Sequence, residues 1–186
     1  YTTSAVQSSL TVNPRRGMFY ATKSVATALF ALVAGIVGIL LAAGVLWLFT
    51  RGHDITALTS DQSRIIPVTL IGFPLTIVLV SLMAQGLGGM TRSTVGGVCA
   101  LIVLFMVLSS VLSITSMAIN QVEWLGTLSY LTPDTAMNHF LGAGIESSSQ
   151  STLAAAVKPN YWIPDWWQSG LILLAWAAAA WAGGLI

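Results

Sequence analysis

Charged residues are scarce in this sequence of 186 residues. Asp, Glu, Lys and Arg make up 7% of the chain and hydrophobic residues 55%, whereas a soluble domain carries about a quarter charged residues. So much apolar surface cannot be buried in one soluble core of this size, but a lipid bilayer supplies an apolar environment for it. The composition therefore excludes an ordinary soluble domain and indicates an integral membrane protein.

Cysteine and catalytic constellations are also sparse. The single cysteine, Cys99, cannot form a disulfide within the chain, and its apolar neighbours predict a small side chain packed in a core. His53 and His139 have no Cys or carboxylate at metal-ligand spacing, so we expect both to be solvated. A site built from Ser129, Asp134 and His139 is disfavoured, because residues five apart on a helix turn away from each other. No catalytic, cofactor-binding or metal-binding residue is assigned.

Four long apolar runs dominate what is present. They contain no Asp, Glu, Lys, Arg or His and cover residues 24–50, 65–84, 94–119 and 169–186. A helix needs about 20 apolar residues to cross the hydrocarbon layer, and uninterrupted runs of this length do not fit the alternating strands of a barrel. We predict an all-α membrane protein with four transmembrane helices. The lack of ionisable residues in these runs disfavours an ion-coupled carrier.

The charges between the runs predict an orientation. Basic residues on the first side are Arg15, Arg16, Lys23 and Arg92, and those on the second side are Arg51, Arg64 and Lys158. All six acidic residues lie on the second side. Because basic residues favour the cytoplasmic side, we expect residues 1–23 in the cytoplasm and residues 120–168 outside the cell.

The outer segment predicts one further short helix. Thr132 can cap it, Pro133 fits its first position, and Gly142 or Gly144 ends it. Its apolar face comprises Met137, Phe140 and Leu141. This spacing indicates an amphipathic helix that dips into the outer interface.

Small residues and prolines mark the first two helices. Ala34, Gly38 and Ala42 form a small-x-x-x-small row, with Ala31 and Gly35 beside it, which predicts close helix packing either between two subunits or within one. Pro67 and Pro74 predict a bend in the second helix, and the glycines that follow Gln85 predict a loosened turn before Arg92.

Hydroxyl side chains gather in the outer half of the third helix. They are Ser109, Ser110, Ser113, Thr115 and Ser116. Such groups can line a substrate path, or they can bond to the backbone of their own helix or to a neighbouring helix. Both interpretations stay open at this point.

Several stretches together resemble a known family. The stretch "SSLTVNPRRGMFYATKSVATALFALVAG" resembles the region before the third membrane helix of bacterial ABC-2-type transporter permeases, and "SLMAQGLGGMTRSTVGGVCALI" is similar to the junction between their fourth and fifth helices. The stretch "LSYLTPDTAMNHFLGAG" is similar to the outer element before their last helix, and "IPDWWQSGLILLAWAAAAWAGG" to that last helix. The order and spacing of these stretches carry the resemblance over nearly the whole chain.

The resemblance implies that the four predicted helices are the third to sixth of a six-helix permease. The chain begins at Tyr1 rather than Met and ends inside an apolar run, so we expect it to be part of a longer polypeptide that contains the first two helices. Actinobacterial members of the family are the most similar. The localisation implied is the bacterial cytoplasmic (inner) membrane, with residues 1–186 forming a multi-pass transmembrane permease domain.

The resemblance also implies partners. They are an ABC ATPase subunit that binds ATP and Mg, a second permease subunit, identical or different, and membrane lipids, but no nucleic acid. By position, a coupling helix at residues 3–13 would contact the ATPase. The expected coupling residues are Val6, Gln7, Ser8, Ser9, Leu10, Thr11, Asn13, Arg15 and Arg16. The alternative is that the basic residues only anchor this region to anionic lipid headgroups.

The expected function is that of the membrane-spanning subunit of an ATP-driven ABC exporter. It would move a hydrophobic or amphiphilic substrate, such as a lipid or a drug-like compound, between apolar helices. The chain would not be an enzyme, since it has no G-x-x-x-x-G-K-[ST] loop and ATP hydrolysis would belong to the separate subunit. The alternatives are a nonenzymatic membrane scaffold or sensor subunit that binds a partner through its outer segment and, third, an ion-coupled carrier.

Overall fold

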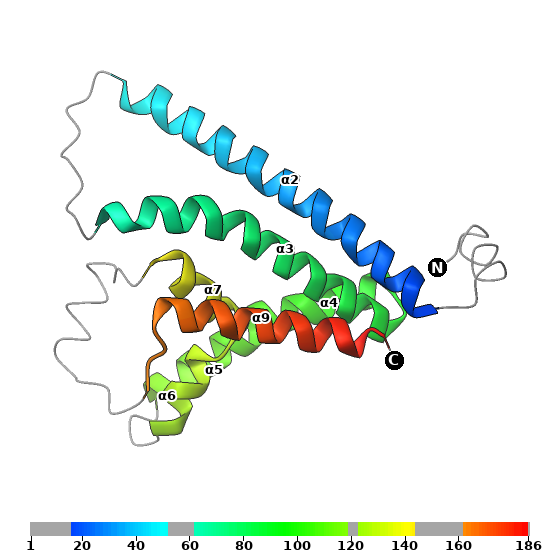
Figure 1. The fold of residues 1–186 in the computed structure, drawn as a ribbon. Coiled ribbons are helices and arrows are strands. Elements are labelled where there is room, and N and C mark those ends of the chain that lie inside the picture. Colours follow the sequence, from blue (N-terminus) through cyan, green and yellow to red (C-terminus); the bar gives the residue numbers. More distant parts are fainter. Residues whose placement is uncertain (1–15, 52–61, 119–122, 144–161, 186) are drawn as a thin grey trace.

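The computed structural model describes residues 16–51, 62–118, 123–143 and 162–185, and these residues are helical almost throughout (Figure 1). No strand occurs within these ranges. Three helical segments are long and apolar enough to cross a membrane: Gly17–Thr50, Ile65–Thr91 and Thr94–Thr115. The all-α prediction is therefore confirmed and three of the predicted crossings are supported, while the fourth crossing stays a prediction.

Helices α2 (Arg16–Thr50) and α3 (Ile65–Thr91) run antiparallel and diverge along their length (Figure 1). Each is longer than the apolar run that predicted it, because helical structure continues into the polar flanks. A short 3-10 turn, η1 (Gln62–Arg64), precedes α3. Figure 1 shows that α3 is bent, as predicted, and Pro74 lies inside it. Proline bends a helix because it lacks the backbone N–H and its ring displaces the preceding turn.

The predicted third helix is one rod in three parts. It comprises α4 (Thr94–Ile102), the π-helical segment η2 (Val103–Val107) and α5 (Leu108–Ala118). A tight turn joins α3 to α4: Arg92 takes a left-handed conformation with φ 49°, and the Ser93 side chain accepts a hydrogen bond from the Gly96 N–H at 3.3 Å. The last carbonyl groups of a helix and the first N–H groups of the next need hydrogen-bond partners outside the helix, and this turn supplies some of them.

A helical hairpin follows, made of α6 (Glu123–Tyr130) and α7 (Pro133–Leu141). The helix predicted to start at Pro133 is confirmed, whereas α6 was not predicted. Leu131, at the corner of the hairpin, accepts a hydrogen bond from Trp176 Nε1 at 2.8 Å. Trp176 lies about 15 Å along α9 (Trp166–Gly183) at 1.5 Å per residue. Helix α7 and the corner at Leu131 therefore pack along α9 to its middle, whereas α6 packs mainly against α5.

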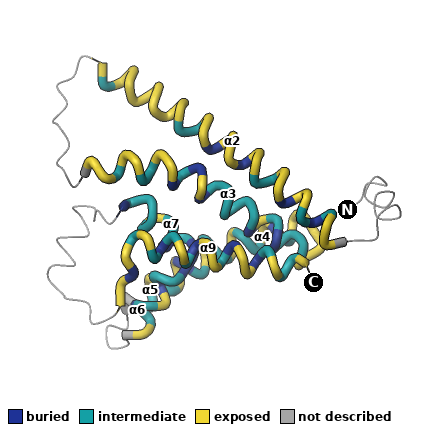
Figure 2. Tube along the Cα trace, viewed as in Figure 1, coloured by how far each residue is buried: buried dark blue, intermediate teal, exposed yellow. Residues whose placement is uncertain are grey.

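Helix α3 packs against α2, α4, α7 and α9, and α9 packs mainly against α3 and α7. Leu173, Ala177 and Ala180 of α9 form a buried hydrophobic cluster with Met83 of α3, so this cluster lies between the two helices. By contrast, α2 is exposed along much of its length, with buried positions on the side that faces α3 (Figure 2). An apolar surface as large as that of α2 requires an apolar environment. The exposed apolar surface thus agrees with a chain that lies in a bilayer.

The helix ends divide into two groups. The start of α2, the α3–α4 turn and the end of α9 lie at one end of the structure, which is called the α2-start end below (Figure 1). The end of α2, the start of α3 and the start of α9 lie at the opposite end. Arg16 and Arg92 therefore share one end, opposite Arg51 and Arg64, as the alternation of the apolar runs predicts. That the α2-start end faces the cytoplasm stays a prediction.

Candidate functional site

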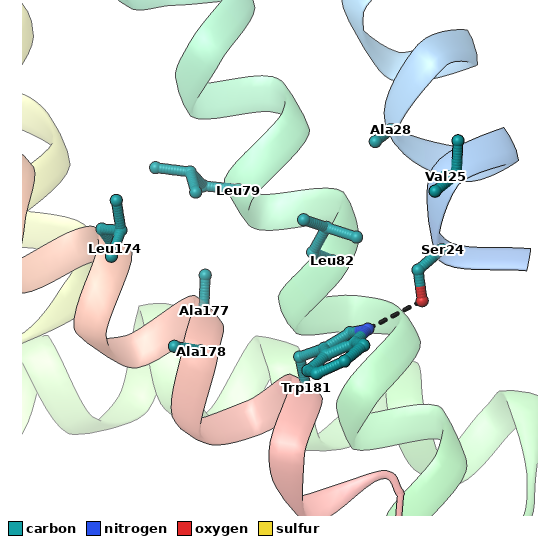
Figure 3. Close-up of a pocket in the computed structure, with 9 residues that line it drawn as sticks. All are labelled: Ser24, Val25, Ala28, Leu79, Leu82, Leu174, Ala177, Ala178 and Trp181. Carbon is teal, nitrogen blue, oxygen red and sulfur yellow. Dashed lines mark hydrogen bonds between the residues drawn. The ribbon is translucent and has the colours of Figure 1, made fainter. Parts of the chain in front are cut away.

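An open pocket of about 330 Å³ lies between α2, α3 and α9, in the half of the structure nearer the α2-start end (Figure 3). We call it the three-helix pocket. Its lining comprises Ser24, Val25 and Ala28 of α2, Leu79 and Leu82 of α3, and Leu174, Ala177, Ala178 and Trp181 of α9. These side chains are almost entirely apolar. The pocket therefore suits a hydrocarbon or aromatic group rather than an ion.

A single hydroxyl group joins the three helices at one edge of this pocket. Ser24 Oγ accepts hydrogen bonds from Trp181 Nε1 at 2.7 Å and from Gln85 Nε2 at 2.9 Å (Figure 3 shows the first). It donates its own proton to the Tyr20 carbonyl at 2.8 Å. A serine hydroxyl has one proton and two lone pairs, so these three bonds use its full capacity. The buried Ser24 is thus a structural link and has no free position for a ligand.

The aromatic ring of Tyr20 supports the same edge. It lies on the preceding turn of α2, is buried, and its ring centroid is 5.7 Å from that of Trp181. Aromatic pairs at this separation and a 43° tilt attract each other. Sequence analysis did not single out Tyr20, Ser24 or Trp181. In the sequence these three residues are marked only as polar or aromatic side chains near the end of an apolar run.

Gly86 sets the distance between α3 and α9. A Cβ atom at this position would lie 2.7 Å from the Trp181 backbone nitrogen and closer still to the Ala180 carbonyl group. Gly86 is buried within α3, which continues to Thr91. The prediction that glycine loosens a turn here is therefore wrong: Gly86 lets two helix backbones approach each other.

The packing of α2 on α3 uses the small residues beside the predicted row. Ala31 and Gly35 are buried, and a Cβ atom at Gly35 would lie 2.8 Å from the Pro74 Cα atom. Of the predicted row, Gly38 is half-buried, whereas Ala34 and Ala42 are exposed. Within this chain the packing row is thus shifted around the helix. Contact of Ala34 and Ala42 with another subunit stays a prediction.

The hydroxyl groups of α5 differ in burial and in hydrogen bonding, and their role in a substrate path stays a prediction. Ser109 is 5% exposed and its Oγ has no hydrogen-bond partner among the described atoms, whereas Ser110 and Ser113 are exposed. Thr115 donates to the carbonyl group of the preceding helical turn at 2.7 Å. Ser110 lines a second pocket, described below. The side chain of Ser116 lies outside the described residues.

The predicted coupling residues also lie outside the described residues, except Arg16. They are Val6, Gln7, Ser8, Ser9, Leu10, Thr11, Asn13 and Arg15. Arg16 is the first residue of α2. Because α2 is unbroken from Arg16 past Ser24, the predicted coupling region leads directly into the helix that forms one wall of the three-helix pocket.

Two predictions about single residues are wrong. Cys99 is exposed in the structure instead of packed in a core, because its face of α4 has no neighbouring helix among the described residues. His139 is not a solvated loop residue: it lies in α7, half-buried, with Nδ1 at 3.2 Å from Ser169 Oγ and its ring edge-on to Tyr130. The hydroxyl of Ser129 donates to the carbonyl group of Gly126 in its own helix at 2.7 Å.

Comparison of the chain with family models, with curated proteins and with solved structures found no match. The geometry itself defines an all-helical chain with three helices able to cross a membrane and an open apolar pocket between helices.

Proposed function

We propose that the chain is the membrane-spanning permease subunit of an ABC-2-type exporter in the bacterial cytoplasmic membrane. It would move a hydrophobic or amphiphilic substrate, while a separate ATPase subunit hydrolyses ATP. The observation that carries this proposal is the three-helix pocket, an open apolar space of about 330 Å³ that α9 forms with α2 and α3, two helices long and apolar enough to span lipid. The order of the family-like stretches in the sequence supports the same function.

The chemistry of the pocket favours apolar cargo. Burial of apolar surface contributes about 25 cal/mol per Å², so an acyl chain or aromatic group gains from contact with Leu79, Leu82 and Leu174. The polar edge gives little to a polar substrate, since the Ser24 hydroxyl and the Trp181 N–H already bond to each other. The pocket is open rather than enclosed, which allows a membrane-dissolved molecule to enter from the side.

The continuity of α2 supplies a route for coupling. A continuous α-helix transmits a rotation or shift along its axis, and Val25 and Ala28 lie on the same helix as the residues nearest the predicted ATPase contact. Displacement of the start of α2 would change the separation of α2 from α9 at the pocket. Such rigid-body motion is a common way to alternate access to a site.

The experiment uses the intact protein purified from its own membrane. We expect a stoichiometric ATPase to co-purify, and replacement of residues 6–11 by alanine to abolish that association. In inverted membrane vesicles, Ala28→Trp should fill the pocket and reduce ATP-driven uptake of an amphiphilic dye at least about tenfold, an effect of about 1.4 kcal/mol. Ala26→Trp is the matched control, because Ala26 lies exposed on the same helix outside the pocket lining.

Other outcomes identify the competing functions. An outer-face partner that binds without any dependence on nucleotide would support the scaffold or sensor subunit and overturn the exporter. Transport that survives ATP depletion but stops when the ion gradient is collapsed would support an ion-coupled carrier instead.

A further inference from the structure

A second open pocket of about 410 Å³ lies between the α4–η2–α5 rod and α7. We call it the rod pocket. Its lining comprises Leu101, Ile102, Phe105, Met106, Ser110 and Asp134. Four of these side chains are apolar, one is a hydroxyl and one is a carboxylate. A carboxylate on the wall of a mainly apolar pocket is a chemical combination that the three-helix pocket lacks.

Asp134 lies in the first turn of α7, where the helix dipole favours a negative charge, and within the described chain no basic side chain pairs with it. Its Oδ1 accepts one long hydrogen bond from Asn138 Nδ2 at 3.4 Å. The Asp134 side chain is half-buried. A carboxylate in such a position attracts a cation more strongly than one in bulk water, because fewer water molecules screen the interaction.

The wall opposite Asp134 suits the apolar body of a cation. Phe105 and Met106 both lie in the π-helical segment η2, a helix type that is rare and often found at functional sites. The face of a phenyl ring attracts a cation, and the flexible, polarizable side chain of methionine adapts to ligands of different shape. Asp134 and these two side chains thus supply charge and apolar contact from two different elements.

From this juxtaposition we infer that the rod pocket binds an amphiphilic organic monocation, with its charge at Asp134 and its apolar body against Phe105 and Met106. The further statement that such a cation is cargo of the exporter rests on the proposed function. The binding itself requires neither an ATPase nor nucleotide. Failure of the two proposals can therefore be distinguished.

Binding is tested with two probes of the same shape and opposite charge. Tetraphenylphosphonium is a cation and tetraphenylborate an anion, and each is titrated into the full protein in phosphatidylcholine nanodiscs by equilibrium dialysis, with empty nanodiscs as reference. We expect saturable binding of tetraphenylphosphonium to the protein and only lipid partitioning of tetraphenylborate. Equal binding of both probes to the protein would overturn the inference, since the charge would then play no part.

Substitutions in the rod pocket test whether the cation binds there. Asp134→Asn should weaken tetraphenylphosphonium binding about tenfold, equivalent to about 1.4 kcal/mol, while Asp134→Glu should keep most of it. Ser110→Trp should block the pocket and leave Asp134 unchanged, which keeps the test valid should Asp134→Asn fail to fold. Val98→Trp is the control, because Val98 is exposed on α4 and does not line the pocket. Unchanged binding in both Asp134→Asn and Ser110→Trp would refute the site.

Lipid is the competing occupant. Phosphatidylethanolamine also carries an ammonium group and apolar chains, so the titration is repeated in nanodiscs that contain it. Persistence of tetraphenylphosphonium binding supports a freely dissolved cation as the ligand. Complete loss of that binding would assign the pocket to a lipid headgroup and overturn the proposed occupant.

Discussion

Trp181 Nε1 donates a hydrogen bond of 2.7 Å to Ser24 Oγ, although the two residues are 157 positions apart in the sequence. The bond ties α9 to the first part of α2 and forms the polar edge of the three-helix pocket (Figure 3). Beyond this region α2 diverges from the other helices, and its later residues are exposed. The helix wall that would move during transport is thus held to α9 mainly at the α2-start end.

Replacement of Ser24 by alanine should weaken this connection. The variant removes the acceptor for both Trp181 Nε1 and Gln85 Nε2, and an unsatisfied buried donor costs about 1–3 kcal/mol. Both donors belong to half-buried side chains, so we expect a total loss of about 2 kcal/mol in the free energy of unfolding. Reversible unfolding in mixed micelles of increasing SDS fraction measures it.

Thr27→Ala is the matched control for this variant. Thr27 lies one turn further along α2, is half-buried, and donates only to the Lys23 carbonyl of its own helix at 2.9 Å. We expect a change within about 0.5 kcal/mol, as for a surface substitution. Equal destabilisation by the two variants would mean that the hydrogen bonds of Ser24 with Trp181 and Gln85 contribute nothing to the free energy of unfolding.

Replacement of Gly86 by alanine should separate α3 from α9. The new methyl group would collide with backbone atoms of Ala180 and Trp181, and backbone cannot yield by a change of rotamer. Overpacking of this kind costs about 1–3 kcal/mol, and we expect the upper end. Gly88→Ala is the control, since a Cβ atom there meets open space and the higher helix propensity of alanine adds up to about 1 kcal/mol. The thermal midpoint of unfolding in detergent should fall for the first variant only.

The long helices were predictable from sequence for a simple physical reason. A run of apolar residues long enough to span lipid must satisfy its backbone hydrogen bonds internally, whatever its neighbours are, so runs 24–50 and 65–84 predicted helices without knowledge of packing. Helix α6 was missed because Glu123–Tyr130 is short and mixes polar with apolar residues. Its position depends on packing against α5 and on the hydrogen bond of the adjoining Leu131 with the distant Trp176, neither of which local spacing reveals.

The candidate site was less predictable than the helices. Ser24 and Trp181 lie in two separate runs and Gln85 directly follows a third, and nothing in their local spacing shows that they meet. Alanine and glycine occupy two adjoining faces of α2, so the sequence could not show which face packs on α3, and the contact with Pro74 selects the face that contains Gly35. Which face of a helix is buried depends on packing against distant parts of the chain, which the periodicity of one helix does not reveal.

Single-cysteine variants test the predicted orientation and the fourth crossing. On a Cys99→Ala background, cysteines replace Gly17, Arg51, Trp162 or Leu185, all of which are exposed. In intact cells a membrane-impermeant maleimide should label only Arg51→Cys and Trp162→Cys, because the other two are predicted to face the cytoplasm. Disruption of the membrane should make all four reactive. Labelling of Leu185→Cys but not Gly17→Cys in intact cells would contradict a crossing by α9.

Replacement of Trp176 by phenylalanine should loosen the α6–α7 hairpin. The change keeps an aromatic ring but removes the hydrogen bond from Trp176 Nε1 to the Leu131 carbonyl. A neutral hydrogen bond contributes about 1 kcal/mol, so amide hydrogens of Glu123–Tyr130 and Pro133–Leu141 should exchange about fivefold faster, as measured by mass spectrometry in nanodiscs. Trp167→Phe is the control, since Trp167 is 50% exposed near the start of α9. If exchange in the hairpin were the same in both variants, the bond at Leu131 would not be what holds the hairpin against α9.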